Sequence, residues 1–248
     1  MSATPVVLTP DWPAPPQVRA AFTTRQGGVS AGAYASLNLG SHVGDAPEAV
    51  AANRAALTRA LALPSEPWWL DQVHGDEVIA LDGPAPGRRG DAAFTARAGV
   101  VAVVMVADCL PVLLCDRAGR QVAAVHGGWR GLAAGIVPRA VAAFDAPPAE
   151  LVAWLGPAIG PRAYVVGAEL RARFLALDEA HARAFHQDDS GWHLDLAAIA
   201  TTQLRAAGVT AISHAARCVH DDGEHFFSFR RDGETGRMAA LVWIEARA

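Results

Sequence analysis

Cysteine is scarce in this chain, and its scarcity excludes a protein stabilised by disulfides. The 248 residues include three cysteines, Cys109, Cys115 and Cys218. They are too few and too irregularly spaced for a disulfide framework. We therefore expect free thiols and a cytoplasmic location, where such thiols stay reduced.

Concentrated positive charge and long apolar runs are also missing. The 21 basic residues are scattered and the formal net charge is −4, whereas nucleic-acid-binding proteins usually carry a basic stripe. No apolar run approaches the roughly 20 residues of a membrane-spanning helix, and the first residues lack the basic flank and apolar core of a signal peptide. We expect neither a nucleic acid nor a membrane as partner. The sequence leaves the oligomeric state open.

Short apolar segments predict a mixed α/β fold. Hydrophobic residues make up 52% of the chain and charged residues 19%, which is enough apolar material for a packed core. We predict a single layered domain over residues 1–248, with a mixed central sheet flanked by helices and an extended N-terminal segment at residues 1–17. The predicted strands are 18–24, 100–106, 112–115, 122–125, 151–155, 209–213 and 238–244, with two more inside 68–79. The predicted helices are 45–61, capped by Asp45, and 132–144, 166–175 and 194–207, while the polar segment 178–192 has the character of an insertion.

Two of the predicted buried strands end close to reactive side chains. The run 100–106 is followed after two residues by Cys109, and the run 122–125 is followed directly by His126. Most lone cysteines are buried apolar residues, and Cys115, inside an apolar run, fits that role. A thiol and an imidazole at neighbouring strand ends could instead face one small site.

Two hypotheses explain the pairing of Cys109 with His126. In one, His126 activates Cys109 as a nucleophile, as in thiol hydrolases. In the other, both bind a metal together with a third ligand, and zinc accepts thiolate and imidazole donors. His74, in an apolar-flanked turn, is the best-placed third ligand, and His42 is the second. The remaining histidines lie in polar or peripheral contexts and are expected to be solvated: His181, His186, His193, His214, His220 and His225.

Glycines beside basic residues indicate places where an anion or ligand could approach. Arg130 stands in a glycine turn that leads into a helix, where backbone N–H groups favour an anion. Arg25 precedes Gly27 and Gly28, which allow close backbone approach to a ligand. The glycine pattern matches neither a P-loop nor a dinucleotide fingerprint.

Seven motifs occur in order between Thr23 and Arg237, over nearly the whole chain. They are TTRQGGVS with SLNLGSHVGD, DQVHGD, GDAAFT, ADCLPVLL, AAVHGGWRG, GPAIGP and FFSFRRDGETGR. Together they resemble the bacterial multicopper-laccase-like, or polyphenol oxidase, family. Members of that family are also described as purine nucleoside phosphorylases and as a peptidoglycan editing factor.

The resemblance implies a zinc site and nucleoside substrates. The family's zinc ligands, in its QVHG, ADC and AVH motifs, correspond to His74, Cys109 and His126. The implied reactions are phosphorolysis of adenosine, guanosine, inosine and methylthioadenosine, and deamination of adenosine. The implied fold is a layered α/β domain related to cysteine-hydrolase-like toxins. This chain departs from the family at Val165, where an acidic residue is frequent, and at Gly127, where alanine is common.

Under this interpretation, phosphate requires a cationic or N–H-rich pocket, and deamination requires an acid–base group. Trp129 or Phe227 could stack on the purine. The candidates for contact with phosphate, ribose or base are Arg25, Asn38 and Arg130. The candidate acid–base groups are Asp91 and Asp108.

Three alternatives remain open. A copper-dependent polyphenol oxidase follows the family's older name, but blue-copper and multicopper centres need several histidine ligands, usually with a cysteine between close histidines, and the sequence shows no such cluster. A metal-free cysteine hydrolase in peptidoglycan quality control keeps Cys109 as the nucleophile. A non-enzymatic binding module in cell-wall metabolism would survive the loss of Cys109.

Overall fold

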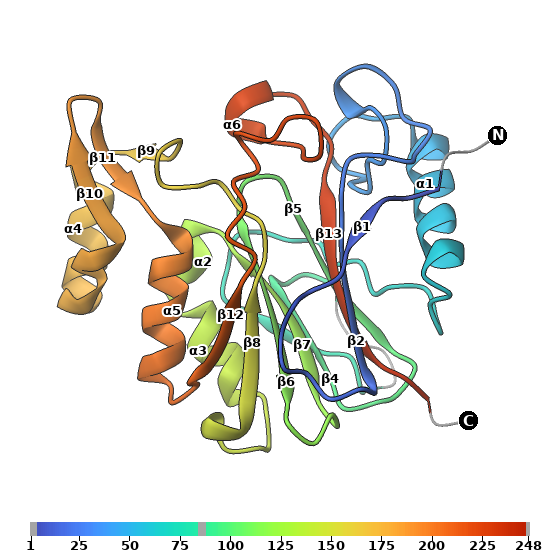
Figure 1. The fold of residues 1–248 in the computed structure, drawn as a ribbon, viewed down its shortest axis with the longest axis horizontal. Helices are drawn as coiled ribbons and strands as arrows, with labels where there is room; N and C mark the ends of the chain where they lie inside the picture. Colours follow the sequence, from blue (N-terminus) through green and yellow to red (C-terminus); the bar gives the residue numbers. More distant parts are fainter. Residues whose placement is uncertain (1–3, 84–87, 247–248) are drawn as a thin grey trace.

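The chain folds into stacked layers of helices and sheets (Figure 1). The computed structural model describes residues 4–83 and 88–246. The central layer is a six-stranded sheet of order β12-β8-β6-β7-β4-β3. Its pairs are antiparallel except at the two edges, where β12 runs parallel to β8 and β3 to β4, so the sheet is mixed, as predicted. The strands are β3 (Val78–Ala80), β4 (Ala92–Thr95), β6 (Leu110–Asp116), β7 (Val122–Gly127), β8 (Leu151–Leu155) and β12 (Ala211–His214).

A second sheet, of order β1-β2-β13-β5, covers one face of the central sheet. Phe22 and Val104 from this sheet share one buried cluster with Leu113 and Ala124 from the central sheet. This apolar contact between two sheets forms the middle of the core. The strands are β1 (Val7–Leu8), β2 (Val18–Thr23), β5 (Val101–Val106) and β13 (Met238–Ile244).

Helices cover the two outer faces of this pair of sheets (Figure 1). α2 (Trp129–Ala134), α3 (Ile136–Ala142) and α5 (Leu196–Ala206) pack on the central sheet. α1 (Pro47–Ala60) packs on the second sheet. Successive residues of β6 point to opposite faces of the central sheet: Leu114 faces the helices, and Leu113 faces the second sheet. An uninterrupted apolar strand is therefore buried on both faces, which confirms the layered α/β prediction.

A smaller sheet of order β10-β11-β9 lies beside these layers, at the left of Figure 1. Segment 178–192 supplies a 3-10 helix, Glu179–Ala184, and most of the hairpin formed by β10 (Phe185–Asp188) and β11 (Gly191–Leu194). β9 (Val165–Val166) is the third strand. The remaining elements are α4 (Ala168–Leu177), α6 (Phe229–Asp232) and the 3-10 helices Gly32–Tyr34 and Pro148–Glu150.

Three local predictions were wrong. The helix predicted over 132–144 is two helices, because Gly135 adopts a left-handed φ of 90° between α2 and α3. Asp45 does not cap α1: the N-cap is Ala46, and the Asp45 carboxylate accepts hydrogen bonds from Ser30 and Asn38 instead. Within 68–79 the only regular strand begins at 78, because amides of residues 73–75 bond to a buried carboxylate rather than to a strand.

The N-terminal segment is extended over residues 4–17, where β1 pairs with β2. Residues 1–3 of the predicted segment lie outside the described residues. The assignment of residues 1–248 to a single domain stays a prediction. In the ranges 4–83 and 88–246, every helix is too short or too polar to cross a bilayer.

A buried asparagine ties the loop before α1 to the helix. The Asn53 side chain has no exposed surface. Its carbonyl accepts the Val29 amide at 2.8 Å, and its NH₂ group donates to Ser30 Oγ, Ser36 O and Asn38 O at 2.9–3.1 Å. The hydrogen bonds of this one side chain thus link residues 29–38, whose regular element is the 3-10 helix Gly32–Tyr34, to α1.

We expect Asn53→Ala to lower the free energy of unfolding by about 2–4 kcal/mol, because each buried polar group left unpaired costs about 1–3 kcal/mol. The measurement is denaturant unfolding. Arg59→Ala, at an exposed position of the same helix, is the matched control and should change stability by less than about 0.5 kcal/mol. Equal losses in the two variants would contradict the network's role.

Candidate functional site

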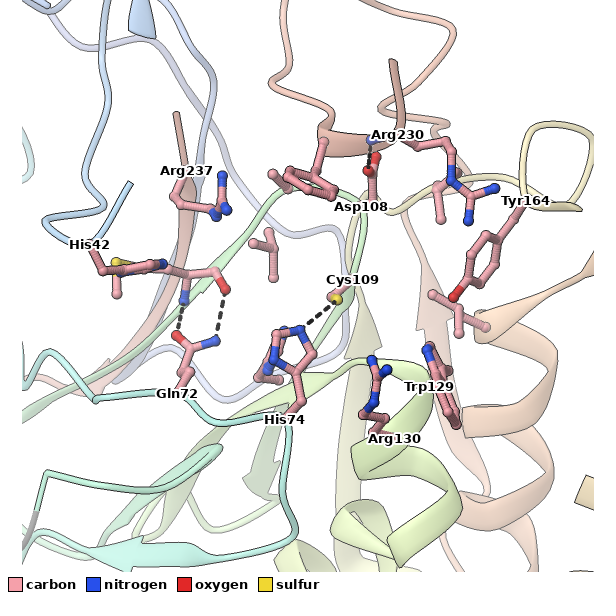
Figure 2. Close-up of a pocket in the computed structure, with 17 residues that line it drawn as sticks. His42, Gln72, His74, Asp108, Cys109, Trp129, Arg130, Tyr164, Arg230 and Arg237 are labelled. Carbon is pink, nitrogen blue, oxygen red and sulfur yellow. Dashed lines mark hydrogen bonds between the residues drawn. The ribbon is translucent and has the colours of Figure 1, made fainter. Parts of the chain in front are cut away.

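A cavity opens where β5, β6 and β7 meet α2 and α6 (Figure 2). Its volume is about 460 Å³, within the range of small-ligand sites. Residues from both sheets, from helices and from five connecting segments line it. They include His42, Gln72, His74, Asp108, Cys109, His126, Trp129, Arg130, Tyr164, Arg230 and Arg237.

His74, Cys109 and His126 converge at the floor of this cavity. Their candidate ligand atoms lie within 4.8 Å of one another. Cys109 Sγ is 3.8 Å from His74 Nε2, and the two imidazole rings meet edge to face with centroids 4.7 Å apart. The structure therefore brings together the three residues that the sequence had singled out. His42 lines the same cavity but lies outside this group.

The buried carboxylate of Asp91 holds both histidines in place. Its oxygens accept the amide N–H groups of Val73, His74 and Gly75 at 2.7–3.1 Å. Oδ1 also accepts Nδ1–H of His126 at 2.8 Å. That bond leaves Nε2 as the free nitrogen of His126. Asp91 is thus a positioning residue, and its oxygens are too fully engaged to serve as the acid–base group suggested from the sequence.

Asp108 positions Cys109 in a comparable way. Its backbone has a left-handed φ of 90°, a strained conformation for a residue with a side chain. The carboxylate accepts hydrogen bonds from Ser228 Oγ and from the Arg230 amide, both at 2.6 Å. These bonds fasten the turn before β6 to α6, so both oxygens of this second acid–base candidate are also engaged.

The electrostatic environment favours the thiolate of Cys109. Burial raises the pKa of the thiol, but the charge and hydrogen bond of His126, with help from His74, outweigh burial and lower that pKa to about 6. Burial lowers the pKa of His126, but the Cys109 thiolate and the Asp91 hydrogen bond raise it to about 9. A thiolate is the form required both of a metal ligand and of a nucleophile, whereas a metal ion would have to displace the proton that the raised pKa keeps on His126.

The geometry of the three donors fits a metal ion. Tetrahedral zinc, with Zn–S near 2.3 Å and Zn–N near 2.0 Å, places sulfur and nitrogen about 3.6 Å apart, close to the observed 3.8 Å between Cys109 Sγ and His74 Nε2. Gly128 leaves space for an ion, because a Cβ at this position would lie 3.0 Å from the His74 ring and 3.2 Å from Cys109 Sγ. This group could therefore hold a metal.

Cationic and aromatic side chains form another part of the cavity lining. Figure 2 shows Arg130, Arg230 and Arg237 with Trp129 and Tyr164 around Cys109. The Arg130 guanidinium lies 4.3 Å from the Trp129 ring centroid, and that of Arg230 lies 4.9 Å from the Tyr164 centroid. Burial, followed by the Cys109 thiolate, raises the pKa of Tyr164 to about 12, so its phenol keeps its proton. This wall can bind an anion and a flat ring.

Sequence reasoning had assigned no role in the site to Arg230, Arg237 or Tyr164. The two arginines belong to the FFSFRRDGETGR motif, and Tyr164 is the third residue after GPAIGP. Both motifs were recognised, but the side chains within them that face the cavity could not be chosen without the fold.

Arg25 and Asn38 lie outside the residues that line the cavity. Arg25 donates to the carbonyls of Ala35 and Gly223, and Asn38 is fully buried, where it bonds to Gly40 and Asp45. Phe227 is likewise fully buried in the core. Among the predicted contacts for phosphate and nucleoside, the structure places Arg130 in the cavity, together with the predicted stacking residue Trp129.

Comparison with known proteins agrees with the motifs. The family model described as multi-copper polyphenol oxidoreductase laccase matches residues 19–245. A Shigella flexneri protein named purine nucleoside phosphorylase YfiH is 49% identical over 96% of this chain and 98% of its own length. A Pseudomonas aeruginosa protein, also named purine nucleoside phosphorylase, shares 49% identity with the same coverage.

Solved structures agree as well. The crystal structure of a Neisseria meningitidis protein has a TM-score of 0.90 and 46% identity, and the match covers 97% of this chain and 99% of that one. A hypothetical protein YfiH from Bacillus licheniformis has a TM-score of 0.88 and 30% identity, with 92% and 93% covered. The chain belongs to the multi-copper polyphenol oxidoreductase laccase family.

Proposed function

We propose that this protein is a zinc-dependent purine nucleoside phosphorylase that acts on adenosine, guanosine, inosine and methylthioadenosine. The observation that carries the proposal is a single cavity lined both by a His–Cys–His donor group and by three guanidinium groups. The names of the relatives agree with it. The free thiols of the described cysteines are compatible with a cytoplasmic location.

Phosphorolysis exchanges a C–N bond for a C–O bond at the anomeric carbon of the ribose. A phosphate oxygen attacks that carbon, and the electron pair of the breaking bond passes to the purine, which takes up a proton and leaves as the free base. We assign phosphate binding to Arg130 and Arg237, and a stacking or packing contact with the nucleoside to Trp129 and Tyr164. A zinc ion held by His74, Cys109 and His126 would supply a Lewis acid in the same cavity.

Zinc is the metal we propose because one thiolate and two imidazoles, with a position left open, are typical of its catalytic sites. Copper is the second candidate, since mononuclear blue-copper sites also use two histidines and a cysteine. Adenosine deamination is a further part of the proposal and rests on the donor group alone. We assign its acid–base role to neither Asp91 nor Asp108, whose oxygens are engaged.

A metal-free cysteine hydrolase is the alternative function. The lowered pKa of Cys109, about 6, favours it, because a thiolate beside an imidazole is also the arrangement of thiol nucleophiles. The same residues would then act without an ion, so metal content separates the two functions.

We expect Cys109→Ala to lose one metal equivalent and to lower kcat/KM for inosine phosphorolysis at least about 100-fold, or about 2.7 kcal/mol. Elemental analysis and release of hypoxanthine in phosphate buffer measure the two effects. Cys218→Ser is the matched control, since Cys218 lies outside the cavity and serine keeps the acceptor for the Gly160 amide. Undiminished turnover by metal-depleted wild type would overturn the zinc-dependent function, and bound metal without nucleoside turnover would overturn phosphorolysis.

Asp91→Asn should weaken metal binding about 10- to 100-fold, because the carboxylate orients His126 and the turn that carries His74. The measurement is competition with a chelator of known affinity. Asp82→Asn is the control. It also neutralises a carboxylate, one that accepts hydrogen bonds from residues 95 and 96 and lies outside the cavity. An unchanged metal affinity in Asp91→Asn would remove the positioning role.

Arg130→Gln should raise KM for phosphate about 10-fold with a smaller change in kcat, since one charge-assisted hydrogen bond contributes about 1.5–3 kcal/mol. Initial rates at varied phosphate and saturating inosine measure this effect. Arg205→Gln, at an exposed position on α5, removes the same charge outside the cavity. A similar KM in the two variants would show that Arg130 does not contact phosphate.

A further inference from the structure

The hairpin β10–β11 carries three donor side chains close together, none of which lines the cavity. His186 stands directly opposite His193 in the strand pairing, and Asp188 follows two residues later on the same strand. Residues two apart in a strand point to the same face. The two imidazole rings stack with centroids 4.5 Å apart, and the donor atoms of all three residues lie within 4.8 Å of one another.

Hydrogen-bond accounting at His193 calls for a cation. His193 Nδ1 lies 2.8 Å from the Pro161 carbonyl, which only accepts, so Nδ1 carries the ring hydrogen. Nε2 then presents a lone pair 3.0 Å from the Asp188 carboxylate and 2.9 Å from Ser190 Oγ. The Ser190 hydroxyl is also 2.6 Å from that carboxylate, and its one hydrogen can serve only one of them. A lone pair of His193 Nε2 therefore faces a lone pair of the Asp188 carboxylate, unless a positive charge lies between them.

We propose that His186, Asp188 and His193 form a second divalent metal site. An extra proton on His193 would satisfy the contact between His193 and Asp188. A proton would not, however, use the imidazole of His186, which lies on the same face of the hairpin. Two imidazoles and a carboxylate suit zinc, nickel or copper. The Nδ1 hydrogen bond to a backbone carbonyl is the outer contact that metal-bound histidines usually make.

The three side chains have the freedom that binding requires. Tetrahedral zinc with ligands near 2.0–2.1 Å places its donors about 3.3 Å apart, so the 3.0 Å contact between His193 Nε2 and Asp188 Oδ1 must lengthen slightly. His186 and Asp188 are exposed and can move, whereas His193 is buried, with 2% of its surface accessible, and serves as the anchor.

The site would fasten the hairpin to a wall of the cavity. His193 bonds to Pro161, and the next residue of β11 donates its amide to the carbonyl of Tyr164. Tyr164 lines the cavity. A metal bound between β10 and β11 would therefore hold in place the chain segment that carries Tyr164. The existence of the site is independent of the proposed function.

The test is a titration of the full-length, chelator-treated protein with Zn²⁺ and Co²⁺. We expect two equivalents per chain for the wild type. His186→Gln should retain one and weaken the other at least about 10-fold. Cobalt distinguishes the sites, because a thiolate-to-cobalt charge-transfer band arises only at Cys109. Cys109→Ala should keep the hairpin equivalent, which separates this site from the cavity group.

His214→Gln is the matched control, since His214 is exposed at the end of β12 and outside both donor groups. It should bind two equivalents. His186 is exposed, so its substitution should leave thermal unfolding of the chelated protein unchanged. No second equivalent in the wild type below about 100 µM free zinc, or a second equivalent that His186→Gln leaves unaltered, would overturn the proposal and leave a proton as the cation at His193.

Discussion

A carboxylate buried away from water needs hydrogen-bond donors, and the candidate metal group depends on how Asp91 satisfies that need. Asp91 is fully buried. Burial raises the pKa of its carboxyl, but His126 and the backbone amides around His74 outweigh burial and keep the pKa below its ordinary value. The ionised group therefore gathers the turn at His74 and the ring of His126 about itself. Two of the three candidate ligands are placed by this single requirement.

The pairing of β6 with β7 places Cys109, the third candidate ligand. β6 and β7 form a hairpin in which Leu110 pairs with Gly127, so Cys109, one residue earlier, stands beside the chain that has just passed His126. The backbone is strained at His74 and Asp108, whose φ angles are 59° and 90°, at a cost of order 1–3 kcal/mol each. Hydrogen bonds to the two aspartate carboxylates offset that cost. The donors are thus fixed by the fold before any ion arrives.

The parts of the site that depend on local pattern could be predicted, and those that depend on distant contacts could not. Cys109 and His126 stand at the ends of apolar strands, a feature visible in the sequence alone. Asp91 looked equally suitable for proton transfer, because nothing local reveals that its oxygens are used by a turn 16 to 18 residues earlier. Arg25 and Asn38 resembled ligand contacts, yet the irregular loop around them uses their polar groups for its own backbone.

His126 and His193 show one physical device used twice. Each is buried, each gives its Nδ1 hydrogen to an oxygen, and each thereby leaves Nε2 for another partner. At His126 that oxygen belongs to the Asp91 carboxylate, whereas at His193 it belongs to the neutral carbonyl of Pro161. A negative acceptor makes an imidazole more basic than a neutral one does, and only the cavity group adds a thiolate. The two groups therefore differ in donor strength and softness, so metals of different character can be distributed between them.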